Sequence, residues 1–436
     1  MSKVSNRVLY VVSLNHATND GSVYLLSSLF PVVLSLFDIS VLQVGIIVSL
    51  GYLVNVLFQP VIGHYGEGRD PARLLALGIA LITISIISFI FATGFLSLLA
   101  SVVLLRLGSS FFHPVGISTV SRTYDGPALQ KAMGFQSAFG NLGVLLTFLT
   151  AAPLYLLVGW RSTFLVFAIW TMMDILLTLT VLRSKISRES SNPLAESQES
   201  SSPRIPLFFA VAAFISGGTY AVILNFANIF LGAEAHLGVS QANLIVSSFI
   251  ALAFIGALAT GGWRRFLPTN VVLAISYLVA FVTIAAFTLV AGNVILGTVA
   301  LLANGFAISS TYPLTYTELS RYLAAMNQKA GRSFGLLSSS QTIGASILGL
   351  VSGYISQFLG LGVAFGVVAG LTLLGSVATF LWIRGGNRRG YKPISDKRYR
   401  TRFVGTQALG WNETRMAETM DPLNRRTLPE ERGRNN

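Results

Sequence analysis

Cysteine is absent from this chain of 436 residues, and charged residues are scarce at 11%. The lack of cysteine excludes disulfides, iron–sulfur clusters and thiolate zinc sites. The shortage of charge accompanies 53% hydrophobic residues and a mean hydropathy of +0.67, which a soluble domain does not tolerate. Water therefore cannot be the main solvent, and open sheets are excluded because lipid offers no partners for unpaired backbone groups.

Enzyme signatures are also missing. The four histidines are well separated and stand without cysteine or an acidic cluster, so no nucleophile or metal constellation is evident. No phosphate-cradling Gly-Lys-Ser/Thr loop is present, which argues against ATP as the energy source. We expect neither an enzyme nor a cofactor or metal. The net charge of +13 comes from scattered basic residues without a base-reading motif, so we expect the lipid bilayer and not nucleic acid as a partner.

Long apolar runs fill the chain to residue 384. About 20 such residues suffice to cross about 30 Å of hydrocarbon as a helix. The first run carries polar residues between positions 15 and 20 and lacks a cleavage pattern, so it is interpreted as a span and not as a signal peptide. The sequence predicts an all-α integral membrane protein with twelve transmembrane helices near residues 8–36, 42–63, 74–95, 97–121, 132–158, 162–182, 206–232, 242–262, 270–291, 294–319, 334–358 and 362–384.

A Ser-rich, charged stretch divides these spans into six plus six, and it is interpreted as a solvated linker. An internal repeat supports the division, because residues 109–122 line up with 308–321 and residues 134–143 with 335–344. Two homologous halves are a transporter plan. We predict two pseudo-symmetric six-helix bundles around a central cavity, with the segments 1–183, 184–205 as linker, 206–385, and 386–436 as a basic cytoplasmic tail.

Basic residues gather on one side of the predicted membrane. With twelve spans both termini share that side, which holds fifteen Lys and Arg residues before the tail, whereas the opposite loops hold only Arg161. Cytoplasmic loops carry such an excess. We therefore expect a multi-pass protein of the cell membrane with both termini in the cytoplasm.

The first span contains LNHATNDG (14–21), in which Asn15 and Asn19 are four residues apart, as are His16 and Asp20. Helical spacing favours one shared face. Such groups are expensive in lipid, so they should face a cavity as a binding or proton site. Alternatively, they form a structural patch against a neighbouring helix.

The fourth span contains Arg106, Ser109, Ser110 and His113 at helical spacing, followed by Pro114, which interrupts the hydrogen-bond ladder. An arginine at this depth needs a partner, and the candidates are an anionic substrate group or a structural pair with Asp20.

Three further groups complete the candidate residues. Glu67, Arg69 and Arg73 in GHYGEGRDPAR (63–73) could join helix ends across a gating interface or form a plain charged loop. In the second half, substrate contacts are expected from Asn225, Asn228 and Tyr312, although Asn and Tyr also fill cores. For Asp174 and Glu318 a structural role is preferred, with Glu318 pairing with Arg321.

Five segments in order resemble a known family: NHATNDG (15–21), QPVIGHYGE (59–67), GSSFFHPVG (108–116), GFQSAFGNLGV (134–144) and GWRSTF (159–164). With them the chain resembles the major facilitator superfamily, and within it the fosmidomycin-resistance-like efflux proteins, over about residues 5–385. The resemblance implies alternating access and proton-driven export of small molecules, and it nominates His16, Asn19, Asp20, His113 and Pro114.

The sequence thus predicts a secondary active transporter of small solutes, acting as a monomer and exporting a drug or metabolite in exchange for protons. Asp20 and His16 are expected to carry the proton, and substrate contacts are expected from Arg106, Ser109, His113, Asn15, Asn19, Asn225, Asn228 and Tyr312. An importer of organic anions or metabolites is the nearest alternative. A channel or a transporter-derived sensor would be proteins of a different class.

Overall fold

The computed structural model describes residues 3–66, 68–124, 126–182, 205–263, 266–326 and 331–388, and every regular element in these ranges is a helix. The first bundle consists of α1 (Lys3–Ser28), α2 (Phe30–Leu36), α3 (Val41–Gly66), α4 (Pro71–Ile90), α5 (Phe95–Ser109), α6 (Phe112–Thr123) and α7 (Gly126–Val181). The second consists of α9 (Leu207–Glu234), α10 (Val239–Trp263), α11 (Thr269–Val290), α12 (Val294–Ala325), α13 (Gly331–Leu359) and α14 (Leu361–Arg388). The predicted linker 184–205 and tail 386–436 lie almost wholly outside the described residues.

The helices provide twelve membrane crossings, which confirms the predicted fold class. Ten segments of the described chain are long and apolar enough to cross a membrane, and one of these, Ala132–Val181, is 50 residues long. That segment holds two crossings, because Gly159 takes a φ of +76° and reverses the chain there. Such a φ costs glycine nothing. The remaining crossing is α1, whose mid-span polar residues lower its hydropathy.

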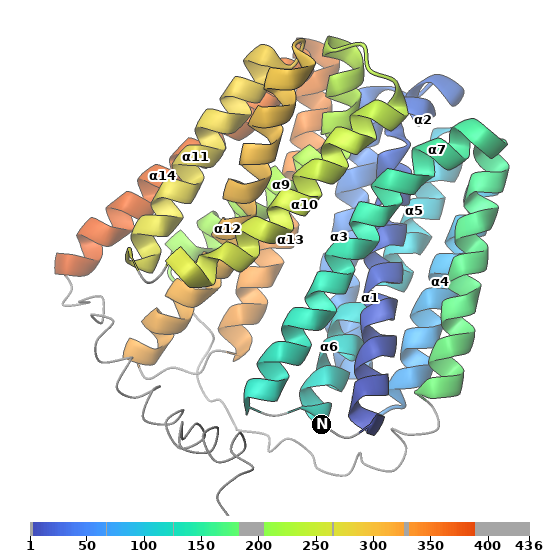
Figure 1. Ribbon diagram of the computed structural model, residues 1–436, viewed down its shortest axis with the longest axis horizontal. Helices are drawn as coiled ribbons and strands as arrows, with labels where there is room; N and C mark the ends of the chain where they lie inside the picture. Colours follow the sequence, from blue (N-terminus) through green and yellow to red (C-terminus); the bar gives the residue numbers. More distant parts are fainter. Residues whose placement is uncertain are drawn as a thin grey trace, which may run out of the picture. The chain divides into compact units, whose positions relative to one another are not determined.

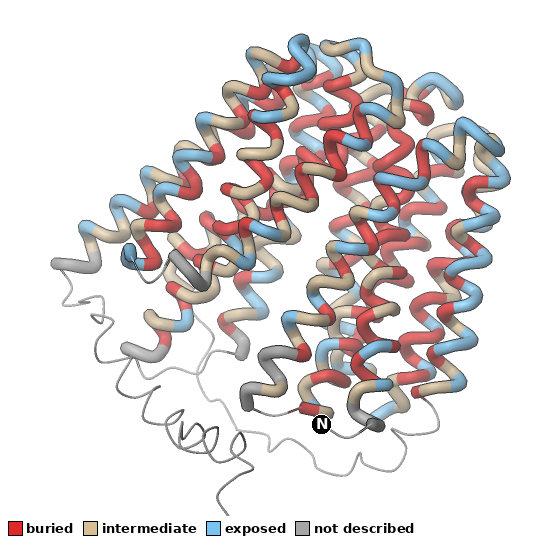
Figure 2. The backbone as a smooth tube through the Cα atoms, in the orientation of Figure 1, coloured by how far each residue is buried: buried red, intermediate tan, exposed pale blue. Residues whose placement is uncertain are grey.

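The two bundles are built alike (Figure 1). In the first, α1 packs against α7, and in the second α9 packs in the same way against α13. Between the bundles, α3 contacts α13 and α10 contacts α7, which are again equivalent pairs. Buried positions lie along the inner faces of the helices, and exposed positions lie on the outer faces (Figure 2). Large apolar side chains such as Leu157 and Leu289 are exposed there, as expected of surfaces that meet lipid.

Glycines set the closest helix contacts. A Cβ at Gly143 would lie 2.0 Å from the carbonyl oxygen of Ala17, and a Cβ at Gly353 would lie 2.6 Å from the Cα of Gly45. Only a residue without a side chain permits these approaches between α1 and α7 and between α3 and α13. These glycines therefore set how closely the helices pack.

Two predicted spans are broken where a proline removes a backbone donor. Pro114 cannot donate to the carbonyl of Ser110, and a proline ring also clashes with the carbonyl four residues earlier. The fourth span accordingly divides into α5 and α6 at Ser110 and Phe111. Pro31 has the same relation to Ser27, and the first span divides at Leu29 into α1 and α2. The break at Leu29 leaves backbone carbonyls free at the end of α1.

Candidate functional site

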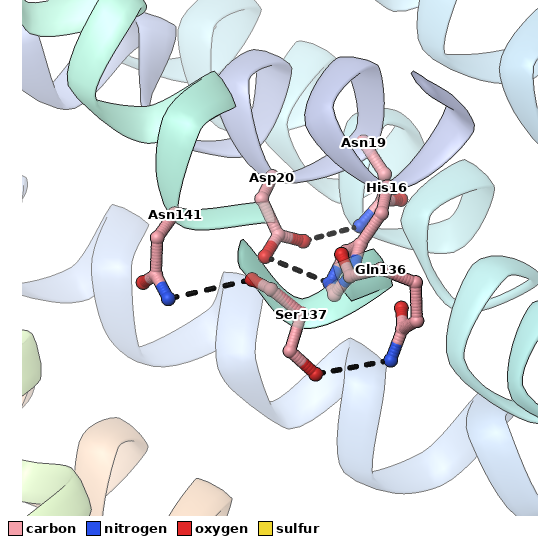
Figure 3. A network of polar contacts seen from close by, with 6 residues as sticks. All are labelled: His16, Asn19, Asp20, Gln136, Ser137 and Asn141. Atoms are coloured by element: carbon pink, nitrogen blue, oxygen red, sulfur yellow. Dashed lines mark hydrogen bonds and ion pairs between the residues drawn. The ribbon is translucent and has the colours of Figure 1, made fainter. Parts of the chain in front are cut away.

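A polar cluster lies where the middle of α1 meets α7 (Figure 3). His16 Nε2 is 3.2 Å from Asp20 Oδ2, and His16 Nδ1 is 2.8 Å from the carbonyl oxygen of Gln136. Asn19 Nδ2 donates to the other oxygen of Asp20 at 2.8 Å. The predicted spacing of His16 and Asp20 on one helical face is confirmed, and α7 supplies the third partner.

The acceptors around His16 determine what the cluster can hold. The carbonyl oxygen of Gln136 can only accept, so Nδ1 of the ring must carry a hydrogen. Nε2 then faces a carboxyl oxygen of Asp20, and two bare acceptors at that distance would repel each other. A proton must therefore lie between them, either on the imidazole or on the carboxyl group. In this geometry the pair shares one proton.

Two residues of α6 complete the cluster. The ring of Phe112 stacks on His16 with centroids 4.4 Å apart, and the His113 ring meets His16 edge-on at 5.5 Å. His16, Asp20 and His113 each present one ligand-type atom, and these atoms all lie within 4.8 Å of one another. The arrangement suits a cation, and the three residue types could also hold a divalent metal ion.

Gly140 of α7 makes room for the pair. A Cβ at this position would lie 2.7 Å from His16 Nε2 and 2.9 Å from Asp20 Oδ2. Because any larger residue would push these two atoms aside, the absence of a side chain is part of the site. Gly140 lies one helical turn beyond Gln136, so both act on His16 from the same face of α7.

Arg106 of α5 lies in a second, aromatic setting. Its guanidinium carbon is 4.2 Å from the centroid of the Tyr52 ring on α3, and the Tyr52 hydroxyl is 2.8 Å from the Tyr24 hydroxyl on α1. Arg106 is only 4% exposed, yet its Nε has no hydrogen-bond partner. Within the described chain it forms no ion pair, with Asp20 or any other acid.

An arginine that is buried without a counter-ion is costly. The contact with Tyr52 supplies part of the compensation through the ring quadrupole. Sequence reasoning missed Tyr24 and Tyr52, although both are polar-tipped aromatics in the middle of apolar spans. The remaining hydrogen-bonding capacity of the guanidinium suits an anion.

Ser109 and Ser110 stay with Arg106 at the end of α5, and both are buried. Ser110 Oγ donates to the Arg106 carbonyl at 2.7 Å and contacts Asn55 Oδ1 at 3.2 Å. His113 lies beyond the break in the helix and joins His16. The helical spacing that grouped His113 with Arg106 therefore does not continue across the break.

Asn15 points away from the proton-holding pair. Its Nδ2 donates to Asp174 Oδ1 and to Thr178 Oγ1, both at 2.8 Å and both on the second span of α7. The sequence analysis expected one shared face for these residues, but Asn15 bonds the second span of α7 whereas His16 bonds Gln136 on its first span.

Asn225 and Asn228 of α9 join the two bundles. Ser27 Oγ donates to Asn225 Oδ1 at 2.7 Å, and Asn228 Nδ2 donates to the carbonyl of Ser27 at 2.9 Å. Asn243 of α10 donates to the carbonyl of Ser28 at 2.7 Å. These carbonyls are the ones that the break before Pro31 leaves free. We call Ser27, Ser28, Asn225, Asn228 and Asn243 the bundle latch.

The other candidates lie apart from both clusters. The Tyr312 ring packs on Tyr316 with centroids 4.6 Å apart. Glu67 lies outside the described residues, whereas Arg69 stacks on Tyr65 and Arg73 pairs with Asp70 at 3.5 Å. Glu318 pairs with Arg321 at 3.9 Å, which confirms the structural pair predicted for it.

Comparisons with known proteins agree with this architecture. A model described as Major Facilitator Superfamily matches residues 12–326 and 209–418. The fosmidomycin resistance protein of Escherichia coli (strain K12) is 24% identical over 400 residues, which cover 87% of this chain and 94% of that protein. The uncharacterized MFS-type transporter YfnC of Bacillus subtilis (strain 168) is 29% identical over 151 residues, which cover 34% of this chain and 37% of that protein.

Two solved structures share the fold. A bacterial homolog of the human lysosomal transporter Spinster, in an inward-facing and unoccupied conformation, superposes with a TM-score of 0.73 at 15% identity, covering 87% of this chain and 97% of its own. The nucleoside transporter NupG superposes with a TM-score of 0.68 at 14% identity, covering 87% and 99%. At these identities the likeness concerns the fold alone.

Proposed function

The chain belongs to the major facilitator superfamily, and on that premise we propose that this membrane transporter is a proton-coupled exporter of small solutes. In this proposal the two bundles rock about a midplane site, so that the site faces each side of the membrane in turn. The protein acts as a monomer, with small molecules and protons as its ligands. The name of the E. coli relative, a resistance protein, supports export over import.

The observation that carries the proposal is the His16–Asp20 contact of 3.2 Å with Gln136 behind it. A proton held between two titratable groups inside the membrane can be loaded on one side and released on the other. Asn19 bonds only one oxygen of Asp20, so the other remains committed to the shared proton. The pair supports the role of both residues as the coupling site.

Arg106 supports an anionic group on the transported solute. Its permanent positive charge has no acidic partner in the described residues. An anionic group bound between α1, α3 and α5 would balance this charge. We propose that a solute bound at Arg106 lies next to the Tyr52 ring, which already contacts the guanidinium. The same feature favours the alternative of an organic-anion importer, which the direction of transport distinguishes.

The bundle latch suggests which state this structure represents. It lies at the end of α1 that is remote from the N-terminus, and the basic loops support a cytoplasmic N-terminus. Ser49 and Ser346 join α3 to α13 near the same end, with Ser346 Oγ donating to the Ser49 carbonyl at 2.9 Å. In this orientation the outer side is closed, and the structure is assigned to an inward-facing state.

Vesicle transport tests the proposal directly. In everted membrane vesicles with an acidic interior, we expect the protein to accumulate solutes from a panel of labelled organic anions that includes fosmidomycin. Collapsing the pH gradient should abolish the accumulation. Accumulation that persists without the gradient would contradict the proposed proton coupling. Concentration only into right-side-out vesicles would favour the importer.

Adding a methyl group at position 140 should disrupt coupling without unfolding the protein. In Gly140→Ala the new Cβ would displace His16 Nε2 and Asp20 Oδ2, which are the ends of side chains and can move. We expect gradient-driven transport to fall about tenfold or more, because even a small misplacement of a reacting group can cost that much. Gly134→Ala on the same helix, with nothing within 4 Å of its Cβ, is the matched control. Equal activity of both variants would contradict the role of Gly140.

The orientation can be measured with single cysteines, because the native chain has none. A cysteine introduced at Ser190 in the predicted linker should react with an impermeant maleimide only after the cells are opened, and one at Ala235, which follows α9, should react in intact cells. Labelling of Ser190→Cys in intact cells would place the linker outside the cell and contradict the predicted topology.

A further inference from the structure

A pocket lies on the lipid-facing side of the first bundle, between α1 and the second span of α7. It has a volume of about 400 Å³, within the roughly 300–1,000 Å³ of small-molecule sites. Its walls are apolar and include Leu14, Trp170 and Leu177. Trp170 and Leu177 are exposed on the outside of the bundle, so the pocket opens towards the hydrocarbon.

A carboxyl group forms the floor of this pocket. Asp174 lines the pocket and is only 2% exposed. Its Oδ1 accepts from Asn15 Nδ2 at 2.8 Å, whereas its Oδ2 has no hydrogen-bond partner. The Thr18 hydroxyl lies within hydrogen-bonding reach of the same carboxyl group. Its oxygen accepts from Trp170 Nε1 at 3.1 Å, so its hydrogen is available to the carboxylate.

Asn15 lies behind the Asp174 carboxyl group and does not line the pocket. Asn15 uses its amide nitrogen for both Asp174 and Thr178, and its own Oδ1 is buried without a partner. No cationic side chain of the described residues pairs with Asp174. A buried carboxylate without a cationic partner in a low-dielectric setting favours a ligand that brings a positive charge and N–H groups.

We propose that this pocket binds a protonated lipophilic amine that enters from the bilayer. The ammonium group pairs with the Asp174 carboxylate, and the apolar part packs against Leu14, Trp170 and Leu177. A neutral acyl chain would fill the same walls but leave the carboxylate without a cationic partner. The pocket lies on the side of α1 opposite the His16–Asp20 pair and goes beyond the proposed export function, on which it does not depend.

Equilibrium binding of tritiated octylamine to the full chain in phosphatidylcholine nanodiscs tests the proposal, with protein-free nanodiscs subtracted. We expect saturable binding at neutral pH that unlabelled octylamine displaces and octanol does not. Asp174→Asn keeps an acceptor for Asn15 but removes the charge, and it should weaken binding at least about tenfold, the scale of one charge-assisted hydrogen bond. Leu177→Trp should weaken it as strongly by filling the pocket.

Matched controls isolate the two effects. Asp38→Asn removes a carboxylate from an exposed loop position, and Leu165→Trp adds the same bulk to another exposed site of α7; both should bind octylamine as the wild type does. If Asp174→Asn fails to fold, Leu177→Trp decides the matter. Wild-type affinity in either pocket variant would overturn the proposal. Displacement by octanol would also overturn it, because the pocket would then recognise the alkyl chain and not the ammonium group.

Discussion

Replacing Asp20 by asparagine is expected to abolish gradient-driven transport while preserving exchange of substrate across the membrane. An amide cannot share a proton with His16 Nε2, so the loading step is lost, but the amide side chain still fills the space beside Gly140 and can bond Asn19. The bundles can then move only with substrate bound. Accumulation driven by an imposed pH gradient, compared with counterflow of labelled substrate in the same proteoliposomes, measures the two activities separately.

The control for this change is Asp38→Asn, which makes the same substitution at an exposed position with a positive φ. It should retain both activities. Normal pH-driven accumulation by Asp20→Asn would exclude Asp20 as the coupling group. Loss of counterflow together with accumulation would instead assign Asp20 to the structure or to substrate binding.

The second large effect is expected from Arg106→Lys. The lysine keeps the positive charge and its contact with the Tyr52 ring, but it loses the planar fork that can bond an anion through two N–H groups. Losing one charge-assisted hydrogen bond costs about 1.5–3 kcal/mol, or about 10- to 100-fold in affinity. We expect a folded protein whose Kd for an anionic substrate rises by that factor, measured by equilibrium binding in nanodiscs.

Arg161→Lys, at an exposed position after the turn at Gly159, provides the matched control and should bind as the wild type does. A structural role of Arg106 leads to a different result, because disturbing it would lower the melting temperature and expression while the folded fraction kept its affinity. Wild-type affinity in a stable Arg106→Lys protein would refute recognition through the planar fork.

The sequence predicted the features that depend on a single helix. The spacing of His16 and Asp20 gave their contact correctly, and the proximity of Glu318 to Arg321 gave their pair. Span positions were also close to the observed helices, because hydropathy over about 20 residues is a strong signal. The sequence predicted the helix ends less well. At Ser110 and Ser27 the carbonyl loses its usual donor because a proline stands four residues later, and the helix breaks there.

Features that depend on a neighbouring helix could not be derived in this way. A polar residue in mid-span has several neighbours to choose from, and nothing in LNHATNDG shows that Asn15 faces Asp174 while His16 faces Gln136. The roles of Tyr24 and Tyr52 require three helices to be assembled first. Likewise, Asn228 bonds the carbonyl of Ser27, which becomes available only because the helix breaks before Pro31.

That break has a consequence for the rate of opening. When the bundles part on the outer side, the carbonyls of Ser27 and Ser28 lose the amides of Asn228 and Asn243. The backbone offers no substitute, because Pro31 has no N–H for Ser27 and the Val32 N–H, which would serve Ser28, donates to Leu29. Water must replace the lost donors as they leave, so wetting of the outer vestibule is part of the opening step itself. Osmolytes that withdraw water from narrow spaces should therefore hold the carrier in its inward-facing state.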